Sequence, residues 1–341
     1  MADEGVMGPL LTLQVHETLH AAARAGATKV ECSLDLDRSA TTVEVDTAGW
    51  RWQGQRFPWL DICKDRTIYH WVGEGFQPLA RFTTSLIKLV PTQWGPPTFE
   101  IDGIKMLPTA QVSPYAYAER KVGLIQPRGK MILDTCGGLG YFAAWCLRGE
   151  AAQVLSYEKN PDVIWLRSLN PWSPRIDSRL TLIRGDITGQ ISALPSESVG
   201  AILHDPPRFG IAGELYSQAF YDQLARVIKR KGRLFHYTGT PNKLTSGRDV
   251  PNEVAKRLGR VGFVAESATA QVAPAGPSIC LSRLLAAVVT GEPNSSSPHR
   301  RLHDRPTLAP RVTRSSSSCS NCSGIPPSIP AMAKSRASFE G

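Results

Sequence analysis

The positions of apolar residues change their period partway along the chain. In the first third, apolar and polar residues alternate, for example from Val30 to Leu36 and from Thr42 to Asp46. Alternation is typical of strands with one buried face. The segment from Leu10 to Ala25 is rich in leucine and alanine and predicts an amphipathic helix instead. We therefore expect residues 1–108 to form a small module, one helix followed by short strands.

From Lys130 onward, short apolar runs alternate with segments of helical period. The runs that predict strands are 131–134, 153–158, 180–185, 199–204 and 232–235. Strands that alternate with helices form parallel sheets with helices on both faces. Residues 109–290 are therefore predicted to be an α/β domain with a Rossmann-like, doubly wound parallel sheet.

The last 51 residues, 291–341, have a different composition from the rest. They include 12 Ser and 7 Pro, and Phe339 is the single aromatic residue among them. Such a segment buries too little apolar surface to offset its ordering entropy, which predicts a disordered, basic tail. The tail contains Cys319 and Cys322 in a CxxC pair, which is half of a zinc site. With no second pair beside it, we expect no metal.

The overall composition excludes several classes of protein. With 42% hydrophobic residues, the chain has enough apolar surface for a folded core. No run of 18 apolar residues is present, so no membrane-spanning helix is expected. The N-terminus lacks a basic segment followed by an apolar run, and the seven cysteines are an odd number spread over the chain. We therefore expect a cytoplasmic protein with reduced thiols.

The net charge of +9 is unevenly distributed. Residues 1–120 carry −3, residues 121–290 carry +8 and the tail carries +4. A basic domain favours a polyanionic partner, and RNA is the partner we expect. Five of the eight tryptophans lie in the N-terminal module. They can stack on nucleic-acid bases or pack a β-rich core, and the negative charge of the module favours the core.

Candidate chemistry gathers where the predicted strands end. The strand that ends at Asp134 runs into a glycine-rich turn, Thr135 to Tyr141. Such a turn between strand and helix brings backbone N–H groups close to a ligand. The following predicted strands end at Glu158, Asp186 and Asp205. Open parallel sheets bind ligands at this edge, although each acid alone is equally compatible with a helix cap or a solvated turn.

These motifs, in the order DTCGGLGY, YEKNP, RGDI and HDPPRF, resemble class I S-adenosylmethionine-dependent methyltransferases. Longer stretches, including PPTFEIDGIKM and NPWS, are similar to a little-characterised archaeal-type methyltransferase family. The resemblance implies S-adenosylmethionine as the cofactor. It implies that Asp134, Gly138 and Gly140 hold the methionine portion of this cofactor.

The same resemblance implies that Glu158 binds the ribose hydroxyls and that Asp186 and Ile187 contact the adenine. One position departs from the family pattern, because Cys136 stands where the turn usually has its first glycine. We include Cys136 among the expected cofactor-binding residues.

The sequence Asp205-Pro-Pro-Arg-Phe209 predicts a rigid loop, because each proline fixes its own φ and restricts the preceding residue. In methyltransferases that act on nitrogen, a similar loop holds the target base. The resemblance assigns Asp205 and Pro206 to the acceptor N–H groups. Arg208 stands at the usual aromatic position, so the match is imperfect and the stacking role is expected of Phe209, which follows it. The predicted activity is therefore methyl transfer to a nitrogen of an RNA base, although the prolines alone are also compatible with a simple turn.

Two alternatives remain open at this stage. The stretch from Asp205 to Leu224 also resembles spermidine-synthase-type aminopropyltransferases, whose cationic substrates are disfavoured beside a +8 domain. A catalytically inert nucleic-acid-binding scaffold is the second alternative. His236, after the last predicted strand, is either a general base or a hydrogen-bonded strand-end residue.

Overall fold

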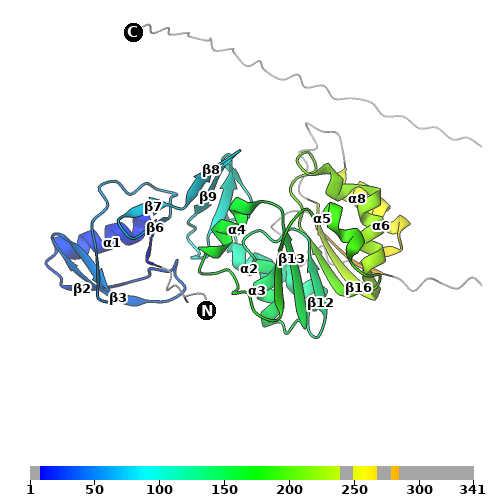
Figure 1. The fold of residues 1–341 in the computed structure, drawn as a ribbon, viewed down its shortest axis with the longest axis horizontal. Coiled ribbons are helices and arrows are strands. Elements are labelled where there is room, and N and C mark those ends of the chain that lie inside the picture. Colours follow the sequence, from blue (N-terminus) through cyan, green and yellow to red (C-terminus); the bar gives the residue numbers. More distant parts are fainter. Residues whose placement is uncertain (1–7, 239–248, 267–277, 284–341) are drawn as a thin grey trace, which may run out of the picture. The chain divides into compact units, whose positions relative to one another are not determined.

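A computed structural model describes residues 8–238, 249–266 and 278–283 of the chain (Figure 1). All of these described residues belong to one compact unit. The expected disordered tail and its Cys319–Cys322 pair lie outside the described residues. In the described part of the chain, no helix is long and apolar enough to span a membrane.

The N-terminal part contains the expected helix and is otherwise built from short strands, but the helix is shorter than the predicted Leu10–Ala25 because Leu10 and Leu11 form strand β1. Thr12 caps helix α1 (Leu13–Arg24) by accepting a hydrogen bond from the Val15 amide. An antiparallel sheet follows, in the order β2-β3-β4-β5. Its strands are β2 (Lys29–Cys32), β3 (Thr41–Asp46), β4 (Gly49–Trp52) and β5 (Gln55–Phe57). Trp50 is fully buried and stacks on Phe57, which is the favoured core-packing role, whereas Trp94 is 40% exposed and does not follow it.

Two smaller antiparallel sheets complete this part. One has the order β1-β6-β7 and the other the order β11-β10-β9-β8. Their strands are β1 (Leu10–Leu11), β6 (Tyr69–Trp71), β7 (Phe76–Pro78), β8 (Ala80–Phe82), β9 (Leu86–Val90), β10 (Thr98–Ile101) and β11 (Ile104–Lys105). The turn between β10 and β11 places Asp102 and Gly103 at positive φ, as a tight hairpin requires.

The C-terminal part is organised around a seven-stranded sheet in the order β14-β13-β12-β15-β16-β18-β17. The strands are β12 (Met131–Asp134), β13 (Gln153–Glu158), β14 (Leu180–Arg184), β15 (Val199–His204), β16 (Ile228–Tyr237), β17 (Phe263–Glu266) and β18 (Ser278–Arg283). The first five strands in this order pair in parallel, and β18 is antiparallel to both of its neighbours. The chain reverses its direction of winding between β12 and β15, which is where doubly wound sheets bind ligands.

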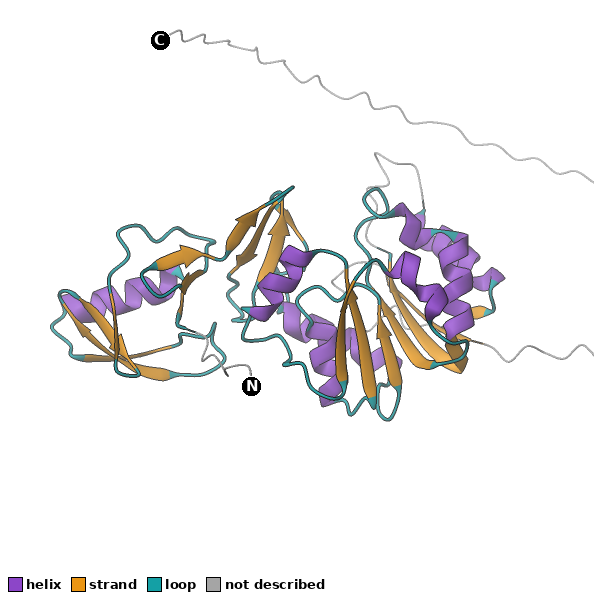
Figure 2. Cartoon of the chain, in the orientation of Figure 1, coloured by secondary structure: helices purple, strands orange, loops and turns teal. Residues whose placement is uncertain are grey.

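Helices cover both faces of this sheet (Figure 2). One layer is α2 (Pro114–Ile125), α3 (Tyr141–Arg148) and α4 (Pro161–Ser168), and the other contains α5 (Ile187–Gln190), α6 (Gln218–Val227) and α8 (Val250–Arg260). Two short 3-10 helices, η1 (Ile191–Ala193) and η2 (Gly213–Tyr216), lie in the connections. The predicted α/β class with a Rossmann-like, doubly wound sheet is confirmed.

The hydrophobic core of the sheet continues into the N-terminal part. One cluster of buried residues joins Ile87, Leu89 and Phe99 of the small sheets to Tyr115 of α2 and Ile132 of β12. The expected domain boundary at residue 108 falls between β11 and α2, so the elements on both sides of it share this cluster. The packing therefore brings β10 next to the glycine-rich turn.

Candidate active site

The four acids at the strand ends lie along one edge of the sheet. Asp134 ends β12 and pairs in register with Ser156 of β13 and Leu203 of β15. Glu158 and Asp205 each come two residues after those partners, so they flank Asp134 on either side. Asp186 follows β14 in the same way, two residues after the Arg184 that pairs with Glu158. Parallel pairing therefore brings all four predicted acids to the carboxyl edge of the sheet.

The glycine-rich turn has a left-handed backbone at two of its positions. Gly138 has φ +48° and Gly140 has φ +82°, a region that glycine adopts without steric cost. Cys136 is not among the positive-φ residues, so its backbone does not require glycine. This explains how the turn tolerates the departure from the family pattern.

Glu158 fixes the turn to the end of β13. One oxygen of its carboxylate accepts a hydrogen bond from the Gly138 amide at 2.9 Å, and the other accepts one from the Asn160 amide at 2.8 Å. Burial raises the pKa of Glu158, although these amides favour the ionised form. A carboxylate held in this way keeps a fixed orientation beside the turn, as a ligand for ribose hydroxyls requires.

A buried arginine that the sequence analysis did not identify lies beneath the turn. Arg167 of α4 donates from Nη1 to the Ser156 hydroxyl at 3.1 Å. A Cβ atom at Gly140 would come within 2.6 Å of its guanidinium, and a Cβ at Gly137 within 2.4 Å of Ser156 Oγ. These two glycines are therefore needed for packing on the protein side of the turn. The sequence signal that could have identified Arg167 is a charged residue on the buried face of α4.

Asp134 is fully buried at the centre of this arrangement. Its Oδ2 accepts a hydrogen bond from Ser156 at 2.8 Å, whereas Oδ1 has no partner in the described structure. Burial raises the pKa of Asp134 to about 6, against the opposing effects of Ser156 and Arg167. A buried acceptor without a donor is costly unless a ligand completes it.

The residues present therefore fit S-adenosylmethionine. Asp134 Oδ1 and the neighbouring Arg167 Nη2 are both buried without a hydrogen-bond partner among the described residues, and a Cβ built on Gly138 meets nothing nearer than Phe99 at 3.8 Å, which leaves room beside the turn. Phe99 comes from β10, so the N-terminal part contributes to this side of the turn. Sequence pattern alone did not point to Phe99, because it belongs to a strand outside the predicted α/β domain.

Asp186 lies at the start of α5, which it caps by accepting from the Thr188 amide. Lys159 forms an ion pair with its other oxygen at 2.8 Å. Burial opposes ionisation of Asp186, but the bonds from Lys159 and Thr188 outweigh it and lower the pKa. Ile187, the other residue expected at the adenine, is buried in the core cluster on this face.

The Asp-Pro-Pro loop is fixed by the segment that follows it. The Tyr216 hydroxyl donates to the Pro207 carbonyl at 3.0 Å, and Phe209 packs edge-to-face on the Tyr216 ring. Pro206 is buried and Asp205 is partly exposed. The predicted acceptor residues therefore lie on a loop held from behind, as positioning of a substrate requires.

Asp205 forms an ion pair with a buried lysine. Lys121 of α2 donates from Nζ to Asp205 Oδ2 at 2.9 Å, and 1% of the lysine side chain is exposed. Asp205 Oδ1 has no partner among the described residues. The buried stripe of α2 includes Tyr117, Ala118 and Val122, so a lysine in the middle of an apolar helical stripe was the signal for this residue.

Aromatic rings surround the Lys121 ammonium. It lies 3.9 Å from the ring centroid of Tyr117, 4.6 Å from that of Tyr237 and 5.2 Å from those of Phe142 and Phe235. Rings at these distances attract a cation through their quadrupoles. Burial lowers the pKa of Lys121, and the Asp205 charge opposes that effect. The charge of the Asp205 carboxylate is therefore balanced by the Lys121 ammonium of the same chain.

The two histidines near this edge are bonded within the core. His236 lies between the Tyr221 hydroxyl at 3.0 Å and the Tyr237 carbonyl at 2.9 Å, so both ring nitrogens have partners. His204 lies between Thr135 and the Leu215 carbonyl, and burial lowers its pKa to about 4. Of the two interpretations of His236, the hydrogen-bonded strand-end residue is the one that the geometry favours.

No group of three or more His, Cys, Asp or Glu side chains suited to a metal ion is present in the described ranges. Burial raises the pKa of Cys136, whose thiol accepts a hydrogen bond from Thr135. Because Cys136 remains protonated, it is suited to packing beside the turn and unsuited to nucleophilic attack.

The strand order and the carboxyl-edge site define a Rossmann-like protein with the fold of class I methyltransferases. Uncharacterized protein MJ1233 from Methanocaldococcus jannaschii is 41% identical to this chain over 206 residues, covering 60% of this chain and 70% of that protein. The chain belongs to the same family as this protein. Since the relative is uncharacterized, the kinship assigns no activity. No family model matches the chain.

Solved structures that align with parts of this chain include two kinds of enzyme. A spermidine synthase from Thermotoga maritima aligns with a TM-score of 0.47 and 17% identity, over 60% of this chain and 72% of that chain. An S-adenosylmethionine dependent methyltransferase from Mesorhizobium loti aligns with a TM-score of 0.37 and 16% identity, over 49% and 98% of the two chains. Likenesses this distant do not choose between activities.

Proposed function

We propose that this protein is an S-adenosylmethionine-dependent methyltransferase that acts on a neutral nitrogen, with an RNA base as the acceptor. The observation that carries the proposal is the placement of Asp205 beside the turn of Gly138 and Asp134, with its charge neutralised by Lys121. S-adenosylmethionine, when bound, supplies an electrophilic methyl group on sulfur. The residues around it bind the cofactor and orient the acceptor.

In the proposed reaction Asp205 accepts an N–H of the acceptor at Oδ1, while Lys121 holds Oδ2. Pro206 and the following proline keep the loop rigid, so the nitrogen lone pair faces the methyl group. The bound cofactor would supply the methyl group, and the acceptor nitrogen, once methylated, would release one N–H proton. Asp205 is the group placed to receive that proton, and Lys121 fixes the orientation of the carboxylate through Oδ2.

The ion pair also favours methyl transfer over aminopropyl transfer. A polyamine acceptor is cationic and binds free carboxylates, but the carboxylate at this edge already has an ammonium at 2.9 Å. A second cation there is repelled by the first in a poorly solvated site. A neutral base has no such penalty, and it needs one acceptor oxygen.

Calorimetry with the full chain tests the proposal directly. We expect S-adenosylmethionine to bind, and decarboxylated S-adenosylmethionine to bind at least tenfold more weakly. Transfer of a labelled methyl group to total RNA should depend on Asp205, so Asp205→Asn should bind the cofactor as the native protein does and lose transfer.

Three outcomes contradict parts of this proposal. Preference for the decarboxylated cofactor assigns the site to aminopropyl transfer. Binding of neither cofactor, together with RNA binding that survives Asp205→Asn, assigns the protein to an inert scaffold. Methyl transfer to an acceptor other than RNA would support the methyltransferase activity and contradict RNA as the acceptor.

A further inference from the structure

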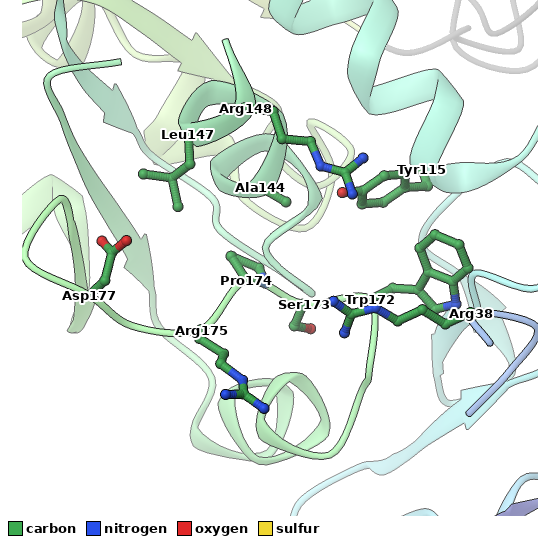
Figure 3. Close-up of a pocket in the computed structure, with 10 residues that line it drawn as sticks. All are labelled: Arg38, Tyr115, Ala144, Leu147, Arg148, Trp172, Ser173, Pro174, Arg175 and Asp177. Atoms are coloured by element: carbon green, nitrogen blue, oxygen red, sulfur yellow. The ribbon is translucent and has the colours of Figure 1, made fainter. Parts of the chain in front are cut away.

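A second polar site lies away from the carboxyl edge. A cavity of about 260 Å³ opens between the loop after β2, the start of α2, the end of α3 and the loop after α4. Three arginines from separate parts of the sequence line it, namely Arg38, Arg148 and Arg175 (Figure 3). We call this cavity and its three arginines the arginine pocket. None of the residues assigned to the cofactor or acceptor above lines it.

The arginine pocket carries uncompensated positive charge. None of the three guanidinium groups forms an ion pair with a carboxylate among the described residues. Asp177 is the single acid in the lining, and it pairs with Arg179 at 3.6 Å, outside the pocket. Because all three exposed arginines lack a carboxylate partner among the described residues, the pocket has a positive potential.

The walls of the pocket are fixed by bonds between distant segments. Arg38 donates to the Pro171 carbonyl, and the Trp172 indole donates to the Leu36 carbonyl at 2.8 Å. The Ser173 hydroxyl donates to the Leu139 carbonyl at 2.7 Å, which anchors the same loop to the end of the glycine-rich turn. These contacts hold the loop after α4 against the N-terminal part, so the pocket is built before any ligand arrives.

Aromatic packing orients Arg148. The Arg148 guanidinium lies over Tyr115 at 5.3 Å and over Trp145 at 5.0 Å from the ring centroids. In Figure 3, Arg148 lies beside Tyr115. Arg38 and Arg175 lie at the other part of the pocket, where Ser173 is. An arginine that stacks on rings keeps its N–H donors for an anion, and planar guanidinium groups bind phosphate oxygens in pairs.

We propose that the arginine pocket binds phosphates of a single-stranded RNA segment. Three unpaired guanidiniums suit phosphodiester oxygens, and the small volume suits one sugar–phosphate unit better than a folded protein surface. That this strand is also the methyl acceptor rests on the proposed function, whereas phosphate binding does not.

The test is fluorescence anisotropy of a labelled 20-nucleotide single-stranded RNA with the full chain, at several salt concentrations. The variant replaces Arg38, Arg148 and Arg175 by Gln. The matched control replaces three other exposed arginines by Gln, Arg24, Arg51 and Arg260, which lie on α1, β4 and α8. Both variants lose the same net charge, so they separate a local site from the overall field.

We expect the pocket variant to bind at least about tenfold more weakly at low salt, and the slope of log K against log salt to fall by about 2, as loss of three phosphate contacts predicts for a single strand. The control should bind within about threefold of the native protein. Equal losses in the two variants, or no RNA binding by the native protein, would overturn the proposal.

Two further arms identify the source of the phosphate and separate the two proposals. Inorganic phosphate that displaces the RNA at equal phosphate concentration would assign the pocket to free phosphate and overturn the RNA proposal. If the pocket variant loses RNA affinity while the native protein transfers no methyl group, the pocket proposal stands and the proposed function fails.

Discussion

The carboxyl edge and the arginine pocket differ in whether their charged side chains are paired. At the edge, Asp205 is neutralised at 2.9 Å by Lys121, whose ammonium is buried among four aromatic rings. In the arginine pocket, Arg38, Arg148 and Arg175 are exposed and have no carboxylate partner in the described structure. A buried charge requires a partner, because desolvation is costly, whereas an exposed guanidinium keeps its water.

This difference indicates what each region can bind. At the edge, the charges of Asp205 and Lys121 cancel, so this region suits a neutral group that offers an N–H. The arginine pocket has three unpaired cations and suits an anion. A substrate with neutral bases on a charged backbone satisfies both regions, which is why RNA is the proposed acceptor.

The largest expected effect comes from breaking the ion pair at the edge. Lys121→Met fills the aromatic surroundings but leaves the Asp205 carboxylate without its ammonium. We expect it to lower the free energy of unfolding by about 3 kcal/mol, as loss of one partner of a buried pair does. Urea unfolding measures this value.

A double-mutant cycle separates the pair from simple packing. Lys121→Met combined with Asp205→Asn should recover about 2 kcal/mol of the sum of the two single losses, because neither charge is then left alone. Strict additivity of the two losses would show that the pair contributes nothing, and the contrast between the two regions would no longer hold.

A smaller, pH-dependent effect is expected at Asp134. Its folded pKa of about 6 lies above the ordinary value of 3.8, so the folded protein holds this proton more tightly than the unfolded chain. This carboxyl therefore lowers stability as pH rises from about 4 to about 6, and the penalty remains at higher pH.

Asp134→Asn removes that penalty. Relative to the native protein without cofactor, the variant should gain about 2 kcal/mol between pH 4 and pH 7, measured by urea unfolding at each pH. His204 titrates in the same window with the opposite sign, but it is common to both proteins and cancels in the comparison. A constant difference between the two proteins across this range would contradict the assigned pKa.

The smallest effect is expected in the arginine pocket. Arg148→Gln and Arg175→Gln should each change the free energy of unfolding by less than about 0.5 kcal/mol, because both side chains are exposed. Thermal unfolding provides the measurement. A loss above about 2 kcal/mol from either change would mean that the arginine maintains the fold, and its place in a binding site would have to be argued anew.

The sequence predicted the strands of the parallel sheet well. The bounds of β13 and β15 agree with the predicted strands 153–158 and 199–204. β15 is apolar from Val199 to Leu203, as expected of a buried parallel strand, whereas β13 also contains Gln153 and Ser156. The segment 80–90 of the N-terminal part is not one strand, because it is divided between β8 and β9. A turn at Thr83–Ser85 interrupts it, and Thr83 bonds to Asp162 of α4, a contact that local pattern does not encode.

Sequence alone determined the order of strands and helices, the left-handed glycines of the turn and the acids at the strand ends. These features depend on local geometry, since residues close together in the sequence determine where a strand ends and where a turn needs glycine. The tertiary structure decided which side chains meet. Lys121 reaches Asp205 across 84 residues, and three arginines from separate segments line one cavity, because packing of the two layers brings together groups whose separation along the chain carries no signal.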